Sequence, residues 1–170
     1  KMQAQFKNPQ IGMELDLTIL VGTMTGTAQL VAQELELTLD GESTRAAAKV
    51  MDGLDAHVFD AGGLFLICTS TYGQGDVPDN AKALFASLQS QRPDLSRVRY
   101  GVIALGDRTY AETFCNGGKR FDALLSELGA KRIWNGDRMV GWGTGAGQPL
   151  LMVCKPYDGK SAVAGNGNMV

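Results

Sequence analysis

The feature that most restricts the fold of this chain is a threefold succession of an apolar run, a polar loop with glycine, and a segment of helical periodicity. The apolar runs span residues 15–21, 64–68 and 98–105. After each one, apolar residues recur at spacings of three and four, which is typical of an amphipathic helix. Strands and helices that alternate in this way predict a doubly wound α/β domain, with a parallel sheet between helices on both faces.

Glycine and proline mark where these helices should end. Gly41 stands where a C-terminal glycine cap belongs, Pro93 closes the second helical segment, and Gly129 follows the third. One segment is ambiguous, because residues 45–49 read Arg-Ala-Ala-Ala-Lys and favour a helix by propensity. The alternation of the other elements instead requires a second strand near this position.

Composition limits the classes of protein to which the chain can belong. The 170 residues suit one domain, and 16 Lys and Arg against 18 Asp and Glu do not favour a nucleic-acid partner. The longest apolar run, 64–68, is far shorter than the ~20 residues that cross a bilayer, so no membrane association is expected. Three cysteines without a CxxC pair indicate neither a disulfide framework nor zinc, which favours a cytoplasmic protein.

The chain divides into three parts. Residues 1–13 are polar and aperiodic, and we interpret them as an N-terminal arm or an expression remnant. Residues 14–142 form the expected domain, with a short final strand over 138–142. Residues 143–170 form a glycine-rich tail of uncertain structure, which looks disordered from residue 159 onward.

The first of the three loops has the composition of an anion site that lacks a basic residue. Residues 23–28 read Thr-Met-Thr-Gly-Thr-Ala, which places three hydroxyls at the start of a helix. Hydroxyls and free amide groups at a helix N-terminus suit a phosphate. The lysine of GxxxxGK[ST] and the full glycine set of GxGxxG are both absent. Threonines that cap the helix without any ligand explain this loop about equally well.

The second and third loops each carry a tyrosine close to glycine. Tyr72 precedes Gly73, and Tyr110 follows Gly106 in the next loop. Each tyrosine alone is better explained as an amphipathic residue at the rim of a loop. All three loops should nevertheless meet at the carboxyl edge of a parallel sheet. Together they predict a site for a planar ring that carries a phosphate.

These loops resemble those of the flavodoxin family. The stretches TxTGTA, TSTYGQGDVPDN and GDRTYAETFCNGGKRFDALLSELGAKR occur in the family's order, and the similarity covers about residues 17–133. It is greatest to short MioC-type bacterial flavodoxins, including the residues QSQRPDLSRVRYGVIALG, and extends to the flavodoxin-like domains of diflavin reductases. The resemblance implies a flavodoxin-like, five-stranded parallel sheet in the order 2-1-3-4-5 and noncovalently bound flavin mononucleotide (FMN). The weak second strand at 46–48 and the glycine-rich tail depart from the family.

By position, the resemblance also implies roles for the loop residues. The first loop would hold the 5′-phosphate, Tyr72 and Tyr110 would stack on the two faces of the isoalloxazine, and the Gly73–Gln74 peptide would lie beside the flavin N5 atom. Backbone groups of the second and third loops would bind the ring edges and the ribityl chain. The expected FMN-binding residues are Thr23, Met24, Thr25, Gly26, Thr27, Ala28, Thr69, Ser70, Thr71, Tyr72, Gly73, Gln74, Gly75, Gly106, Asp107, Arg108, Thr109, Tyr110, Phe114 and Cys115.

No metal site and no substrate-processing residues are recognised. Asp76, Asp79 and Asp107 suit loop capping better than a metal cluster, and His57 lies outside the three loops. Arg108 is expected to ease the negative charge of the fully reduced ring and thereby to raise the potential of the second reduction step.

The resemblance therefore implies an FMN-dependent electron carrier rather than an enzyme with its own substrate. Such a carrier passes single electrons from an NADPH-dependent flavodoxin reductase to a redox acceptor enzyme, and we expect it to be a monomer. Three alternatives remain open: the excised FMN domain of a diflavin reductase, a quinone reductase of the flavodoxin fold, and a binding module without flavin.

Overall fold

A parallel sheet with helices on both faces forms the centre of the computed structural model, which describes residues 14–106, 110–133, 139–143 and 150–154. The parallel strands are β1 (Leu15–Gly22), β2 (Thr44–Val50), β3 (Gly63–Thr69), β4 (Val98–Gly106) and the two-residue β5 (Lys131–Arg132). Their order, β2-β1-β3-β4-β5, confirms the predicted topology. The predicted arm, residues 107–109 and most of the predicted tail lie outside the described residues.

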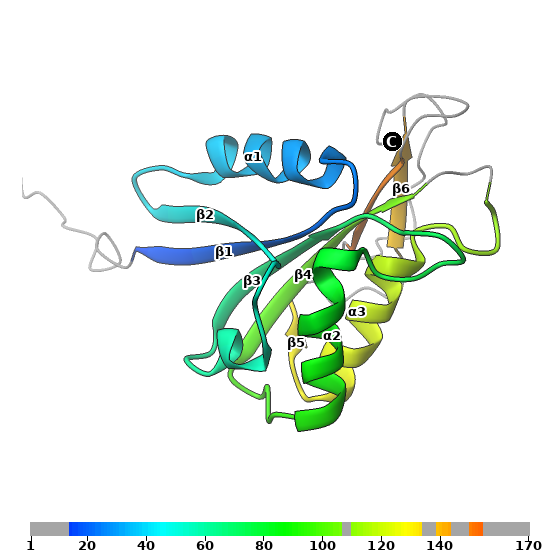
Figure 1. Ribbon diagram of the computed structural model, residues 1–170. Coiled ribbons are helices and arrows are strands. Elements are labelled where there is room, and N and C mark those ends of the chain that lie inside the picture. The colour runs from blue at the N-terminus through cyan, green and yellow to red at the C-terminus, as the bar shows by residue number, and fades with distance from the viewer. Residues whose placement is uncertain (1–13, 107–109, 134–138, 144–149, 155–170) are drawn as a thin grey trace, which may run out of the picture.

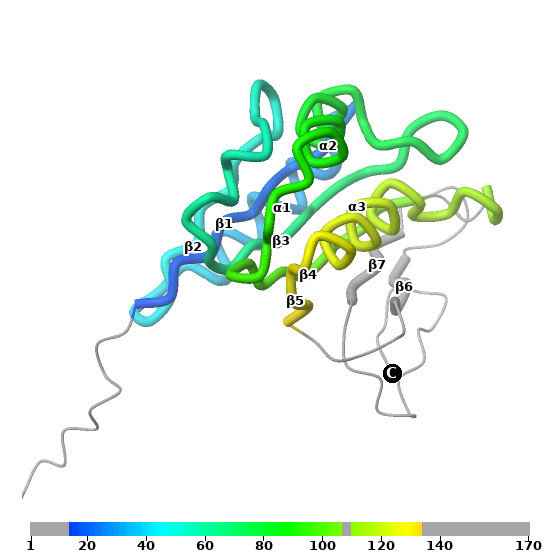
Figure 2. The backbone as a smooth tube through the Cα atoms, turned by 90° about the horizontal axis from the view of Figure 1, so that it is seen from below, coloured from blue at the N-terminus to red at the C-terminus, as the bar shows by residue number. Residues whose placement is uncertain are grey.

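The helices divide between the two faces of the sheet, as Figure 1 shows. Helix α1 (Thr27–Leu39) covers one face, and α2 (Asp79–Gln91) and α3 (Asn116–Glu127) lie side by side on the other (Figures 1 and 2). A short 3-10 helix, η1 (Ala56–Phe59), connects β2 to β3. The described residues thus form the doubly wound arrangement that the alternating sequence pattern predicts.

Both faces of the central strands are buried, which explains why their sequences are apolar throughout rather than alternating. Ile19 and Val21 of β1 pack in the cluster beneath α1, whereas Leu20 between them packs in the cluster beneath α2 and α3. Phe65 and Leu66 of β3 divide between the two clusters in the same way. Two hydrophobic cores therefore fix the sheet from opposite sides.

Residues 44–50 form the edge strand β2 despite the helical propensity of their alanines. In a parallel ladder β2 pairs with β1 from Leu15 opposite Thr44 to Val21 opposite Val50. The outward amides of Ala46 and Ala48 donate to the carboxylates of Asp40 (3.0 Å) and Glu36 (3.1 Å), which lie at the end of α1. Tertiary pairing on both sides therefore outweighs the local preference for a helix.

Two of the three predicted helix ends are confirmed. Gly129 follows α3 with a φ of 96°, and α2 ends at Gln91, two residues before Pro93. The glycine cap predicted at Gly41 is wrong, because α1 ends in an extended Asp40 and Gly41 is not among the positive-φ glycines. The Asp40 side chain is used instead to bind β2, so the chain leaves the helix without a left-handed residue.

The C-terminal region adds an antiparallel hairpin to the sheet. Strand β6 (Met139–Gly143), which corresponds to the final strand predicted over 138–142, pairs with β7 (Leu150–Cys154) rather than with a parallel neighbour. β7 in turn pairs with the last four residues of β4, Ile103–Gly106. The backbone of the predicted tail therefore contributes a strand to the main sheet.

Candidate functional site

The three glycine-containing loops meet at the carboxyl edge of the sheet, as the parallel topology requires. Ser70, after β3, donates its amide to the carbonyl of Gly22 at the end of β1 (2.9 Å). Thr71 donates its hydroxyl to the carbonyl of Leu105 in β4 (3.1 Å) and accepts a hydrogen bond from the amide of Gly117 in α3 (3.0 Å). The second loop is thus tied to both neighbouring strand ends and to a helix.

The first loop turns into α1 through a glycine in the left-handed conformation. Gly26 is the N-cap residue, with a φ of 89°, and its amide donates to the hydroxyl of Thr23 (2.9 Å). The hydroxyls of Thr25 and Thr27 lie 3.4 Å apart on the exposed side of this turn. No side chain caps the helix, so the first amides of α1 keep the hydrogen-bonding capacity and partial positive charge that favour an anion.

The second loop closes on itself in a short hairpin. The amide of Tyr72 donates to the carbonyl of Asp76 (2.9 Å), and the amides of Gly75 (3.1 Å) and Asp76 (2.8 Å) donate to the carbonyl of Tyr72. Gly73 and Gly75 have φ values of 53° and 94°, which L side chains rarely adopt. A side-chain Cβ on Gly73 would meet no atom within 4 Å, so the tip of the hairpin projects into open space.

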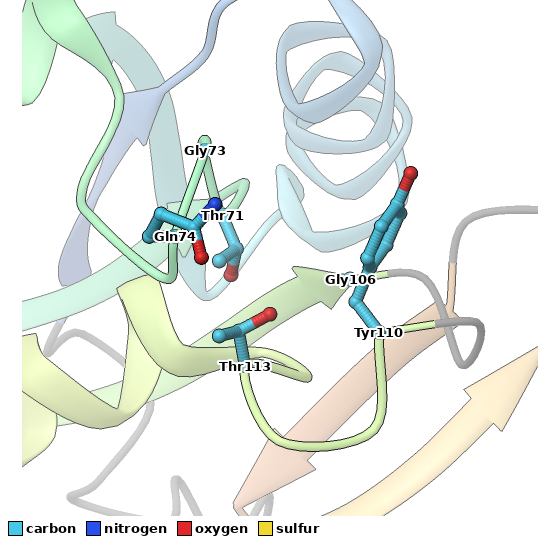
Figure 3. A pocket seen from close by; sticks show the side chains of 6 residues that line it. All are labelled: Thr71, Gly73, Gln74, Gly106, Tyr110 and Thr113. Atoms are coloured by element: carbon cyan, nitrogen blue, oxygen red, sulfur yellow. The ribbon is translucent and has the colours of Figure 1, made fainter.

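A cavity of about 390 Å³ separates this hairpin from the third loop. Figure 3 shows Thr71 and Gln74 on one side of the cavity and the side chains of Tyr110 and Thr113 on the facing loop. The cavity is lined by Thr71, Gly73, Gln74, Gly106, Tyr110 and Thr113. Five of these six residues were predicted from the sequence; Thr113 was not, because nothing distinguishes it from a loop-capping threonine.

The two predicted stacking rings are both accessible. Tyr110 lines the cavity with 66% of its surface exposed, and Tyr72 is 46% exposed on the facing hairpin without lining the cavity itself. The ammonium group of Lys82 lies 5.9 Å from the centre of the Tyr72 ring. Large aromatic surfaces exposed beside a cavity are available to a planar ligand.

The predicted residues at the end of the third loop are less accessible. Phe114 is half-buried, and Cys115 is fully buried, where its thiol donates to the carbonyl of Ala104 (3.4 Å). Burial raises the pKa of the Cys115 thiol to about 12. This placement agrees with a packing role for Cys115 beneath the loop. Asp107, Arg108 and Thr109 lie outside the described residues.

Three further predicted residues, Thr69, Ala28 and Met24, pack beneath or beside the loops. Thr69 and Ala28 are fully buried at the base of the second and first loops. Met24 is 38% exposed, and its sulfur accepts the amide of Asp79 (3.2 Å). The first loop therefore rests against the beginning of α2.

Polar side chains from two helices hold these loops in place, and sequence reasoning missed all of them. Asn80 accepts the amide of Thr23 (2.8 Å) and donates to the carbonyl of Val21 (3.2 Å). Asn116 donates to the carbonyl of Gly75, and Arg120 forms an ion pair with Asp76. A polar residue at the start of a helix is usually a cap or a solvated side chain, so the pattern contains no signal for this role.

The charged groups around the hairpin are paired. Asp76 accepts the amide of Val77 (2.7 Å), and this hydrogen bond, together with Arg120, holds the pKa of the Asp76 carboxyl below its ordinary value. Lys82 pairs with Asp79 (2.6 Å), and this contact raises the pKa of Lys82. Among the described residues, no group of three or more His, Cys, Asp or Glu side chains is placed to hold a metal ion. No helix in the described part of the chain is long and apolar enough to cross a membrane.

Comparison with known proteins agrees with the fold and with the loop motifs. The sequence model of the flavodoxin family matches residues 19–153. Flavodoxin YqcA of Escherichia coli is 42% identical over 118 residues, which are 69% of this chain and 78% of that protein. Protein MioC of the same species is 38% identical over 117 residues, again 69% of this chain and 78% of that protein.

Larger proteins and solved structures extend the same similarity. The flavoprotein alpha-component of NADPH sulfite reductase from Bacillus subtilis is 36% identical over 126 residues, 74% of this chain but 21% of that protein. A cysteine-to-alanine mutant of flavodoxin from Pseudomonas aeruginosa superposes with a TM-score of 0.62 at 34% identity, covering 70% of this chain and 79% of the other. A flavodoxin mutant of Fusobacterium nucleatum bound to flavin mononucleotide shares the fold, with a TM-score of 0.61 at 18% identity and coverage of 71% and 69%. By family match, sequence identity and fold together, this chain belongs to the flavodoxin family.

Proposed function

We propose that this protein binds FMN noncovalently at the three-loop edge and transfers single electrons from an NADPH-dependent reductase to an acceptor enzyme. The observation that supports this most is that the uncapped N-terminus of α1 and a cavity lined by an exposed tyrosine lie at the same edge of the sheet, although no residue of the first loop lines the cavity itself. One feature suits a phosphate and the other suits a planar ring. FMN carries both.

The residues present fit this cofactor. Thr23, Thr25 and Thr27 bring hydroxyls to the start of α1, where a phosphate would also receive the free amides of the helix. The glycines of the second loop let its backbone approach a ring closely, since no side chain stands on Gly73 or Gly75. When bound, FMN supplies the redox chemistry, and the protein binds it, orients it and tunes its potentials.

Electron transfer without a second substrate is the function that the site favours. Asp76 of the hairpin is engaged with Arg120 of α3 and with the backbone amide of Val77. His57 is on η1, where its Nδ1 contacts Asp60 at 2.9 Å, outside the three loops. Asp76 is therefore engaged in structural contacts and His57 lies away from the loops, so neither is placed as the free acid or base that general acid–base catalysis requires.

Titration of the apoprotein with FMN and with riboflavin tests the binding proposal. FMN should bind more tightly, because riboflavin lacks the phosphate that the first loop would hold. A Thr25→Val/Thr27→Val variant should lose FMN affinity while its riboflavin affinity stays within about twofold. Thr38→Val is the matched control, since this threonine lies at the far end of α1 and bonds the carbonyl of Glu34. Equal affinity of the native protein for both flavins would contradict the proposal.

The identity of the electron donor separates the carrier from its alternatives. NADPH alone should leave the yellow holoprotein oxidised, and addition of a flavodoxin reductase should bleach it. Direct bleaching by NADPH, with turnover of a quinone, would favour a quinone reductase instead. The similarity to the sulfite reductase flavoprotein keeps a diflavin origin as the second candidate, which efficient reduction by that enzyme's isolated reductase domain would support.

A further inference from the structure

We infer that the ion pair between Arg120 and Asp76 is a positioning device that sets the first reduction potential of the flavin by anchoring the second loop to α3. This inference rests on the proposed function, because it concerns FMN bound at the three-loop edge. Arg120 and Asp76 are separated by 44 residues, and both side chains are half-exposed. Neither is among the residues that line the cavity.

The hairpin 72–76 is fixed everywhere except at its tip. Reciprocal backbone hydrogen bonds between Tyr72 and Asp76 close its base. Asn116 binds the carbonyl of Gly75, and a Cβ on Gly75 would lie 3.1 Å from the side chain of Thr113, so this residue is packed against the third loop. Gly73 and Gln74 are exposed, and a Cβ on Gly73 would meet no atom within 4 Å, so the peptide between them is the least packed part of the hairpin.

The ion pair adds a side-chain contact at Asp76, the last residue of the hairpin, to the backbone hydrogen bonds that close its base. One oxygen of Asp76 receives both the guanidinium group of Arg120 and the amide of Val77. Arg120 is itself held from the other side, because its guanidinium carbon lies 4.9 Å from the centre of the Phe85 ring in α2. The anchor therefore connects the hairpin to both helices on this face of the sheet.

Anchoring matters for reduction because the Gly73–Gln74 peptide, which is expected beside the flavin N5 atom, would form a hydrogen bond with the ring most favourably from a loop that is already ordered. A loop that must be ordered at the moment of reduction loses part of the free energy of that hydrogen bond as conformational entropy. The net worth of one hydrogen bond corresponds to roughly a 2- to 12-fold change in an equilibrium constant. We therefore expect loss of the anchor to lower the equilibrium constant for addition of the first electron by about fivefold, or about 40 mV at ~59 mV per tenfold change.

Two variants that each remove one charge separate positioning from simple electrostatics. Arg120→Gln removes a positive charge, and Asp76→Asn removes a negative charge while keeping an oxygen for the amide of Val77. Charge alone would move the first potential in opposite directions in these two variants. Loss of the anchor should lower the first potential in both variants. The first potential of the double variant should be no lower than that of the more affected single variant. Arg120→Lys should recover most of the native potential, since the pair rests on one nitrogen–oxygen contact.

Spectroelectrochemical titration of the holoproteins measures this potential, and amide hydrogen exchange of the apoproteins provides a readout without flavin. Gly75 and Asp76 amides should exchange about fivefold faster in both single variants. Arg92→Gln and Glu127→Gln are matched controls, because this pair (2.8 Å) joins α2 and α3 at their other ends. They should change neither quantity.

Opposite shifts of the first potential, or no shift in either variant, would overturn the inference. Unchanged exchange of both amides would overturn it as well. Failure of the native protein to bind FMN would instead refute the proposed function, and the exchange measurement would still decide whether the anchor exists.

Discussion

Helix α3 lies so close to β4 that a single methyl group should decide whether it can pack. A Cβ placed on Gly118 would overlap the Cβ of Ala104 and lie 3.1 Å from the Cγ1 of Val102. Both Gly118 and Ala104 are buried, so neither side has solvent into which an added group could turn. Gly118→Ala should therefore push α3 away from the sheet.

The magnitude follows from two opposing effects. Replacing glycine by alanine inside a helix stabilises it by about 1 kcal/mol through backbone propensity. Overpacking a closely packed interior costs about 1–3 kcal/mol, and this contact lies at the upper end because a methyl overlaps a methyl. We expect the free energy of unfolding of Gly118→Ala to fall by about 2 kcal/mol. For a chain of this size, that corresponds to a loss of about 4–8 °C in melting temperature.

Moving the methyl group instead of adding it should restore the packing. Ala104→Gly alone should lower the free energy of unfolding by about 1–2 kcal/mol, because it removes a buried methyl and loosens a strand. In the double variant Gly118→Ala/Ala104→Gly the total volume is unchanged and the overlap disappears. We expect this double variant to be at most about 1 kcal/mol less stable than the native protein, which gives a coupling of about 2–4 kcal/mol between the two sites.

Urea unfolding of the four proteins completes the cycle. Gly41→Ala is the control, because a Cβ there would meet no atom within 4 Å and the residue has no positive φ; its stability should rise or stay unchanged. FMN affinity should fall in Gly118→Ala and recover in the double variant, since the adjacent Gly117 holds Thr71 of the cavity. Additive changes in unfolding free energy would refute the close approach of α3 to β4.

Other side chains give simpler expectations. Tyr110→Ala should weaken FMN binding by about 1–3 kcal/mol, as loss of one aromatic stacking contact does; unchanged affinity in a fluorescence titration would remove Tyr110 from the site. His57 is the only histidine, and its NMR-measured pKa should lie above 6.5 because the Asp60 carboxylate is hydrogen-bonded to its Nδ1; Asp60→Asn should return it toward 6.5. The stability from this pair should be fully present below pH 6.5 and lost as the pH rises through the raised pKa of His57. Burial raises the pKa of the Cys68 and Cys115 thiols to about 12, so peptide mapping should find neither alkylated at pH 8 until the protein is unfolded.

The sequence predicts the three strand–loop–helix units well because independent local signals agree there. Around β3, for example, a run of apolar residues, a polar loop and the helical spacing of Ala81, Leu84 and Leu88 all indicate one arrangement, and the structure buries all three side chains in one core. Each of the three loops follows a parallel strand, and because parallel strands run in one direction, all three loops must lie at the same edge of the sheet. The lining of the cavity by Thr71, Gln74 and Tyr110 follows from that geometry.

Local sequence patterns fail to predict a secondary structure or a side-chain role that depends on a partner far away in the sequence. The alanines of β2 become a strand because β1 pairs with one side and the carboxylates of Asp40 and Glu36 bind the other. The anchoring side chains of the second loop depend in the same way on how α3 crosses the sheet. In the sequence Asn116 and Arg120 are ordinary polar residues of an amphipathic helix, and only the fold places them against Gly75 and Asp76.

The C-terminal strands illustrate a third case, in which backbone pairing supports the site without contributing a recognised motif. On its inner side β4 pairs with β3 as far as Thr69 opposite Ala104, so Leu105 and Gly106 extend beyond the end of β3. On its outer side β7 pairs with these two residues, through Leu151 and Leu150. Gly106 lines the cavity and begins the third loop, so an unpaired strand end there would fray where the site needs a fixed backbone. The antiparallel hairpin therefore supports the site through the strand that it holds, although the sequence places its second strand, β7, in the glycine-rich tail outside the predicted domain.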